Sequence, residues 1–291
     1  MDHMAARDSF DVGDSSRGGS DETRLARLLF GELADTLDRA LGSDRGEAHA
    51  LDEALDRAAT VARAGELGRA AFDGLHESEA QRFDEAFAAA RTVAKLGGLE
   101  LPDPEAFWQS GVDRERLSRA LIADPTLVPV PAPHGLGAAR WTDLYRAASR
   151  QQGSTLSLAS PLLLAPDIES AFLALDRAGQ SVPVCETDTG STRVSWTIRA
   201  ISASATPPRT GVNHGVGPHP TLPELLMLQL MRVVQGKDPI DAQSFTWVDG
   251  AFSEGKFAAR HFYDAAARGV GVNSREIGSQ GPHLGVRHPV G

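Results

Sequence analysis

The sequence has little of what covalent or metal-based stabilisation requires. Cys185 is the only cysteine among 291 residues, which excludes an intrachain disulfide and an all-cysteine metal site. No apolar run approaches the roughly 20 residues of a membrane-spanning helix. The first residues also lack the basic and apolar segments of a signal peptide. We therefore expect a cytoplasmic protein without a membrane partner, whose fold depends on burial of apolar side chains.

Positive charge is scarce, and the acidic residues are concentrated in the first third of the chain. The formal net charge is −10. Residues 1–100 hold 21 Asp and Glu against 12 Lys and Arg, which leaves 18 against 17 for the remainder. Affinity for nucleic acid comes largely from neutralising phosphates with basic side chains. The charge balance therefore argues against a dedicated nucleic-acid-binding protein.

The first hundred residues predict helices after a disordered tail. Residues 1–19 are rich in Gly, Ser and Asp and carry few large apolar side chains, so we expect them to be disordered. Apolar side chains then recur at helical spacing, and Gly97 and Gly98 end the last apolar stretch. The predicted helices are 20–42, about 43–64, about 67–75 and 78–96. We expect residues 20–98 to form an antiparallel helical bundle that mediates self-association.

Prolines change the pattern between residues 99 and 137. They stand at positions 102, 104, 125, 129, 131 and 133. Because proline lacks an amide donor and restricts the residue before it, residues 128–135 predict an extended connector. One helix, at about 113–123, remains. We therefore interpret residues 99–137 as a proline-rich junction.

Residues 138–291 predict an α+β domain with a β-rich C-terminus. The alternation of Val194, Trp196 and Ile198 with polar residues is typical of a strand. Predicted elements are helices 166–178 and 222–234, paired strands 182–186 and 193–198, and several short strands after 236. Periodicity does not decide whether residues 257–268 form a strand or a helix. The predicted fold class is α+β, with the N-terminal bundle followed by a domain built on a mostly antiparallel sheet.

Two His-Gly-x-Gly segments, at 134–137 and 214–217, carry the candidate catalytic residues His134, His214 and His219. A similar element supplies oxyanion-hole amides in α/β-hydrolases, but the G-x-S-x-G nucleophile elbow of those enzymes does not occur in this sequence. The histidine spacing also differs from that of H-E-x-x-H zinc sites. We predict neither a metal nor a cofactor.

Arginine and aromatic side chains concentrate near the C-terminus and suggest an interaction surface, because both types are enriched at interface cores. The candidates are Trp247, Arg260, His261, Tyr263, Arg275 and Arg287. The alternative is that the aromatics are buried and the arginines pair with nearby carboxylates. We predict a non-catalytic binding or assembly protein that binds a protein partner or self-associates. The competing hypothesis is a metal- or His-dependent enzyme that uses loops 134–137 and 214–219.

Four short stretches of the last quarter match a known pattern. They are Pro220–Leu222, Ser244–Gly250, Lys256–Ala259 and Gly281–Val286. The chain here resembles an uncharacterised actinobacterial domain family, whose members have a Pro-Leu-Thr helix, an F-S-L-x-G-S-R strand, an R-V-P-A-L strand and a closing G-N-x-H-T-W-L-G-x-A-S. The resemblance implies a β-rich end over residues 220–291 and an actinobacterial or actinophage origin. It implies no particular activity.

Overall fold

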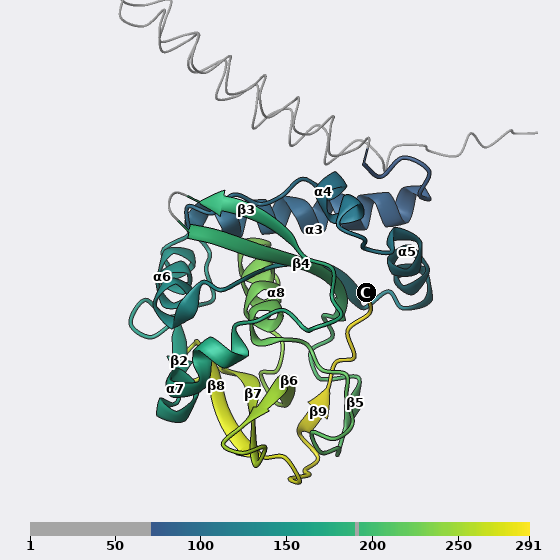
Figure 1. The fold of residues 1–291 in the computed structure, drawn as a ribbon. Coiled ribbons are helices and arrows are strands. Elements are labelled where there is room, and N and C mark those ends of the chain that lie inside the picture. The colour runs from purple at the N-terminus through teal and green to yellow at the C-terminus, as the bar shows by residue number, and fades with distance from the viewer. Residues whose placement is uncertain (1–70, 190–191) are drawn as a thin grey trace, which may run out of the picture. The chain divides into compact units, whose positions relative to one another are not determined.

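The computed structural model describes residues 71–189 and 192–291, in which helices pack between and beside two β-sheets (Figure 1). The strand orders are β1-β4-β3 and β2-β8-β7-β6-β9-β5. The helices are α3 (Glu77–Leu96), α4 (Pro104–Gln109), α5 (Arg114–Ala123), α6 (Gly137–Ser149), α7 (Pro166–Leu175) and α8 (Leu222–Val234). The strands are β1 (Leu127–His134), β2 (Leu162–Leu164), β3 (Cys185–Thr189), β4 (Thr192–Ser202), β5 (Arg209–Thr210), β6 (Phe245–Phe252), β7 (Phe257–Asp264), β8 (Gly269–Glu276) and β9 (Leu284–Val286).

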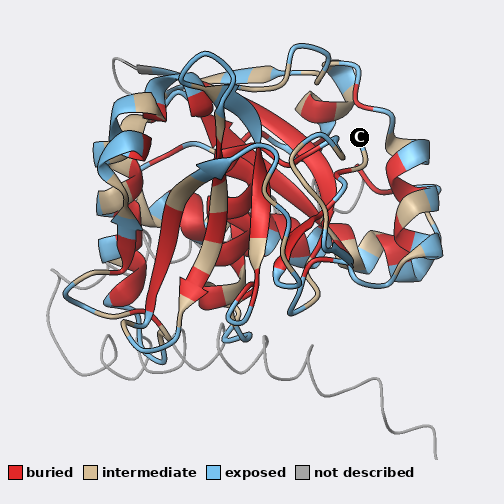
Figure 2. Cartoon of the chain, turned by 90° about the horizontal axis from the view of Figure 1, so that it is seen from below, coloured by how far each residue is buried: buried red, intermediate tan, exposed pale blue. Residues whose placement is uncertain are grey.

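Helix α8 lies between the two sheets and is buried on nearly all sides (Figure 1). Thr221 and Glu224 form a capping box at its start, in which each side chain accepts from the backbone amide of the other residue. The helix packs against α3 and β1 on one side and against β6 on the other. Its apolar residues therefore join the two sheets into one core, as the red centre of Figure 2 shows.

Helix α3 is part of this core, so the predicted helical bundle is wrong for the described residues. The helix has the predicted extent and ends at Gly97, whose amide donates to Ala94 O. Its buried face, including Phe83, Phe87 and Val93, packs against α8 and β1. An amphipathic stripe shows that a helix buries one face, but it does not distinguish a helix from a sheet as the partner. The tail 1–19 and the helices predicted at 20–42 and 43–64 lie outside the described residues. Of the helix predicted at 67–75, residues 71–75 are described, and they form a turn and a bend instead of a helix.

The proline-rich segment 128–135 is extended, but most of it is strand β1 of the three-stranded sheet. The strand pairs antiparallel with β4, with Pro129 opposite Ala200. In an antiparallel pair, alternate residues direct their backbone groups at the partner strand. Because Pro129, Pro131 and Pro133 occupy alternate positions, the residues between them supply the donors to β4. The backbone nitrogens of the prolines therefore face away from β4, toward the unpaired edge of β1. The missing amide hydrogens remove no hydrogen bond between the two strands.

The six-stranded sheet is mixed, which corrects the expected mostly antiparallel architecture. Strands β6, β7 and β8 pair antiparallel, but β2 is parallel to β8 and β9 is parallel to β6. Parallel pairing requires a long connection between the strands. The chain between β2 and β8 contains helices α7 and α8, and such a distant pairing leaves no local sequence signal.

Several predicted elements are confirmed. The helices near 113–123, 166–178 and 222–234 are α5, α7 and α8. The two predicted strands pair as β3 and β4, but β3 begins at Cys185 and not at residue 182. Residues 257–264 form strand β7, and a turn follows at 265–268. None of the helices within residues 71–189 and 192–291 is both long and apolar enough to cross a membrane.

Replacing Phe83 by Ala tests whether α3 belongs to the folding unit of the sheets. The Phe83 side chain is fully buried, so we expect the free energy of unfolding to fall by about 3–5 kcal/mol in one cooperative transition. Urea unfolding followed by circular dichroism and tryptophan fluorescence measures it. The control is Ile122→Ala, because Ile122 is 64% exposed and should change the value by less than about 0.5 kcal/mol. Separate melting of a helical part would contradict the assignment.

Candidate functional site

The first His-Gly-x-Gly segment leads into helix α6, and its amides are bonded to a carboxylate. Gly135 N and Gly137 N donate to Oδ1 and Oδ2 of Asp176, at 3.0 and 2.6 Å. Asp176 is buried directly after α7. Burial raises the pKa of its carboxyl to about 6, although the amide donors oppose that shift. The two amides that an oxyanion hole would need are therefore engaged with Asp176.

His134 is buried at the end of β1, in contact with β4. Its Nε2 lies 3.0 Å from Thr197 Oγ1, and its Nδ1 is buried without a hydrogen-bond partner in the described residues. Burial lowers the pKa of the imidazole to about 4, so His134 is neutral at pH 7. In the described part of the chain, no hydrogen bond or ring contact joins His134 to the second His-Gly-x-Gly segment.

The structure brings His214 and His219 together. Their rings stack with centroids 4.4 Å apart, and His214 also meets the Trp247 ring edge-on at 5.5 Å. Each Nε2 donates to a carbonyl, from His214 to Val248 O at 3.0 Å and from His219 to His214 O at 2.7 Å. Burial lowers the pKa of His219. These contacts attach the loop after β5 to strand β6.

No group of three or more His, Cys, Asp or Glu side chains in residues 71–189 and 192–291 is arranged to hold a metal ion. The pair His214 and His219 directs both Nε2 atoms at carbonyl oxygens, as the preceding distances show. A metal would require lone pairs aimed at one point. The three histidines predicted as catalytic candidates therefore do not form one shared site.

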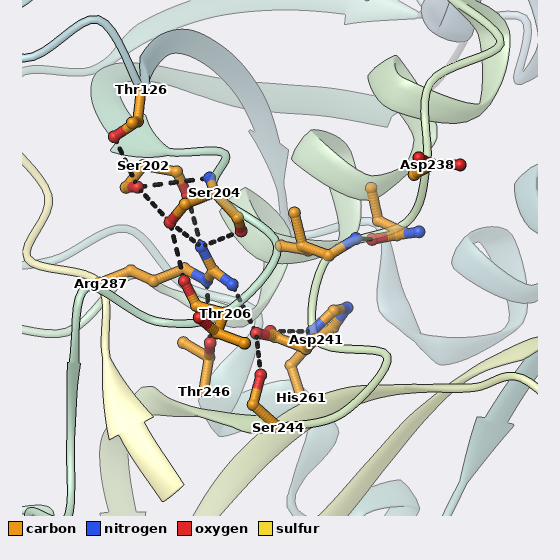
Figure 3. A network of polar contacts seen from close by, with 12 residues as sticks. Thr126, Ser202, Ser204, Thr206, Asp238, Asp241, Ser244, Thr246, His261 and Arg287 are labelled. Atoms are coloured by element: carbon orange, nitrogen blue, oxygen red, sulfur yellow. Dashed lines mark hydrogen bonds and ion pairs between the residues drawn. The ribbon is translucent and has the colours of Figure 1, made fainter. Parts of the chain in front are cut away.

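A buried polar network connects the ends of the two sheets (Figure 3). Arg287, directly after β9, donates from Nη2 to Asp241 Oδ1 at 2.5 Å and from Nε to Thr246 Oγ1 at 2.9 Å. Its Nη1 reaches Ser202 O, at the end of β4, at 2.9 Å. The other carboxylate oxygen of Asp241 lies 2.9 Å from Nδ1 of His261. The side chains of Asp241, His261 and Arg287 are all 0% exposed.

The network contains a His–Asp pair but no activated nucleophile among the described residues. Burial alone would raise the pKa of Asp241, yet Arg287 and His261 outweigh it, so the pKa lies below its ordinary value. Nε2 of His261 is buried without a partner. The nearby hydroxyl of Ser244 donates to Asp241 Oδ1 at 3.2 Å, whereas a catalytic hydroxyl would donate to the histidine. The arrangement is that of a structural ion pair.

Strand alternation separates the six predicted interface residues, so they do not form one surface. His261, Tyr263 and Arg287 lie on the side of the six-stranded sheet that faces the helices, and all three are buried. Arg260 and Arg275 lie on the opposite side. Trp247 is the cross-strand partner of Arg260 and lies on the same side as Arg260. It is buried beneath the loop after β5, and its Nε1 donates to Val212 O at 3.0 Å. Successive strand residues point to opposite faces, which explains this division.

The opposite side carries a layer of aromatic and basic side chains, which we call the outer face: Phe245, Arg260, Phe262, Asn273 and Arg275. The guanidinium carbon of Arg260 lies 4.0 Å from the centre of the Phe245 ring, and its Nε donates to Asn273 Oδ1 at 2.7 Å. The ring of Phe262 lies 5.3 Å from that of Phe245 and covers Gly271, where a Cβ would come within 2.2 Å of it. Any larger residue at position 271 would therefore displace the Phe262 ring.

No helix of the described residues packs on the outer face. The small buried cluster on this side consists of Trp247, Ala258, Leu284 and Val286, all of which belong to strands. The residues that pack with the helices, such as Ala259 and Val272, belong to the main core on the other side. The outer face is thus half-buried at its aromatic rings and exposed at Arg275.

The outer face holds two guanidiniums that lack a carboxylate partner in the described part of the chain. Burial lowers the pKa of Arg260, and repulsion from Arg275 adds to the effect. The alternative pairing of these arginines with Glu254, Asp264 or Glu276 is not observed, since Glu254 pairs with Lys256 and Arg275 donates to Ser279 Oγ at 3.3 Å. Sequence reasoning missed Phe245, which lies on a different strand, and alternation in residues 257–264 is the signal that groups Phe262 with Arg260.

Comparisons of the chain with family models, curated proteins and solved structures gave no match. The resemblance of residues 220–291 to the actinobacterial domain family therefore stays a prediction. The geometry of the described residues makes the outer face the candidate site.

The opposed pKa shifts of His134 and Asp176 predict opposite pH dependence in two variants. The pKa of His134 is lowered to about 4. Its contribution to the free energy of unfolding is therefore fully present above pH 6.5 and is lost as pH falls through 4. The raised pKa of Asp176, about 6, gives stability below pH 3.8 that is lost as pH rises through 6. Each shift corresponds to about 3 kcal/mol.

Between pH 4 and 6.5, unfolding of Asp176→Asn should therefore become harder as pH rises, and unfolding of His134→Gln should become easier. In the unaltered protein the two slopes oppose each other, so its profile should be flatter than either. Urea unfolding across this pH range measures all three. Equal slopes in the three proteins would contradict the two shifts.

Arg287→Met tests the buried network. It leaves the Asp241 carboxylate buried without its cation, and we expect a loss of about 3–5 kcal/mol in the free energy of unfolding. The matched control is Arg116→Met on α5, where an exposed arginine should contribute less than about 0.5 kcal/mol. If the two variants unfold at the same urea concentration, the network does not hold the sheets together.

Proposed function

We propose that this is a non-catalytic binding protein that recognises a protein partner through the outer face. The observation that carries the proposal is the Arg260 guanidinium, which is held against Phe245 at 4.0 Å and fixed by Asn273 but has no carboxylate partner among the described residues. Arginine and aromatic side chains in such positions are typical of energetically dominant interface residues. Because the Arg260 side chain is held in one position before binding, its ordering adds less to the entropy cost of association.

The buried ionisable groups support a binding function over catalysis. Asp176 accepts from the amides of one His-Gly-x-Gly segment, and the histidines of the other donate to carbonyls. Asp241, His261 and Arg287 bond to one another. The competing hypothesis of an enzyme that uses loops 134–137 and 214–219 therefore receives less support from the geometry. A cytoplasmic location and an actinobacterial or actinophage origin belong to the same proposal.

Site-specific crosslinking tests the proposal. Benzoylphenylalanine replaces Phe262 in the full chain within its source cells, and irradiation should give a covalent adduct with a protein partner. Adding Arg260→Glu should suppress this adduct, because it reverses the charge of the outer face. The control position is Leu173 on α7, which is 70% exposed and lies on a different element. No adduct from position 262, or the same adducts from both positions, would overturn the proposal.

A further inference from the structure

The charge of the outer face differs from that of the whole protein. The chain has a net charge of −10, yet Arg260 and Arg275 are close enough on adjacent strands for repulsion to lower the pKa of Arg260. Within the described residues, the arginines that do have a carboxylate partner are Arg146, Arg193, Arg199 and Arg287. Two neighbouring guanidiniums without a carboxylate are unfavourable by themselves, and an anion would remove that repulsion.

The rings beside these guanidiniums indicate what else the ligand must carry. The rings of Phe245 and Phe262 lie on the same side of the sheet, tilted by 52° to one another, and both are partly exposed. Apolar rings next to a guanidinium fit a ligand that combines a negative charge with an apolar group. Arginine binds a carboxylate through two parallel hydrogen bonds, and Nε of Arg260 is already occupied by Asn273. Its two terminal nitrogens are the donors that remain for a ligand.

We propose that the outer face binds an acidic segment of a protein partner, with a carboxylate at Arg260 and Arg275 and an adjacent apolar side chain on Phe245 and Phe262. The inference rests on the proposed function and specifies its partner. A peptide with Glu or Asp beside a large apolar residue supplies both groups from one extended strand. The positive charge of Arg260 and Arg275 also repels basic surfaces of other proteins.

A nucleic acid is the weaker candidate for the same guanidiniums. Binding of a nucleic acid engages several phosphates along the strand and depends on a continuous basic groove. The outer face has two unpaired guanidiniums, whereas Asp264, Glu254 and Glu276 lie on the same strands or their connecting turns. These carboxylates would repel the successive phosphates of a strand, and they would likewise repel carboxylates of a peptide other than the one at the arginine pair. A short acidic peptide requires only the local pair.

Fluorescence anisotropy with the purified full chain tests the inference. The probes are a fluorescein-labelled peptide of Ser residues with one Glu beside one Phe, the same peptide with Gln for Glu, the same with Lys for Glu, and a single-stranded oligonucleotide. We expect the Glu peptide to bind at least about tenfold more tightly than the Gln peptide, because carboxylate hydrogen bonds to arginine are charge-assisted. Affinity for the Glu peptide should fall as salt rises.

Two variants identify the arginines. Arg260→Gln should lower the affinity for the Glu peptide by about tenfold and leave the Gln peptide unchanged. Arg275→Gln should act in the same direction, and its exposed position preserves the fold if Arg260→Gln unfolds the protein. The control Arg116→Gln removes one positive charge from α5, which packs on α3, β1 and β4, and should change neither affinity.

Equal affinity for the Glu and Gln peptides, or tighter binding of the Lys peptide or of the oligonucleotide, would overturn the inference. The crosslinking experiment separates this failure from failure of the proposed function. If position 262 captures a protein partner while the peptides bind equally, the outer face is a binding site of different chemistry. If position 262 gives no specific adduct and the peptides bind equally, both proposals fail.

Discussion

The fold depends on one buried ion pair between Arg287 and Asp241. The guanidinium contacts the end of β4 through Ser202 O and strand β6 through Thr246, while Asp241 contacts β7 through His261. Burying two charges is costly, and their attraction offsets that cost only when all remaining donors and acceptors are satisfied. The carbonyl of Ser204 accepts a further bond from Nη1 at 2.8 Å. The ends of both sheets are therefore held in one relative position.

Asp241 also shows how this pair fixes the backbone. Its φ angle is 61°, in the left-handed region that non-glycine residues rarely adopt. Its amide donates to Ala205 O at 2.9 Å, and its carbonyl accepts from Tyr263 N at 3.1 Å. The side-chain pair and these backbone bonds together maintain a conformation that the chain would not adopt alone. An analogous pair, Arg199 with Glu224, joins β4 to the start of α8.

Local sequence signals identified the elements that local physics determines. The apolar residues at 222–234 indicated helix α8, and the glycine pair after Leu96 marked the end of α3. The helical bundle was wrong because the partner of an apolar stripe is not encoded in the stripe. The proline-rich segment was interpreted as a connector because each proline alone disfavours a strand. The prolines occupy alternate positions, so the residues between them still donate their amides to β4.

The candidate site could be predicted only in part, for a related reason. Alternation groups Arg260 with Phe262 and separates both from His261 and Tyr263, but the sequence does not say which group faces the helices. The long-range pairing of Asp241, His261 and Arg287 decides this, because it requires His261 to point inward. Arg260 is then forced to the outer face, where no carboxylate of the described residues meets it. Two arginines of the same chain thus have opposite roles, since Arg287 neutralises a buried internal charge and Arg260 remains available to an external one.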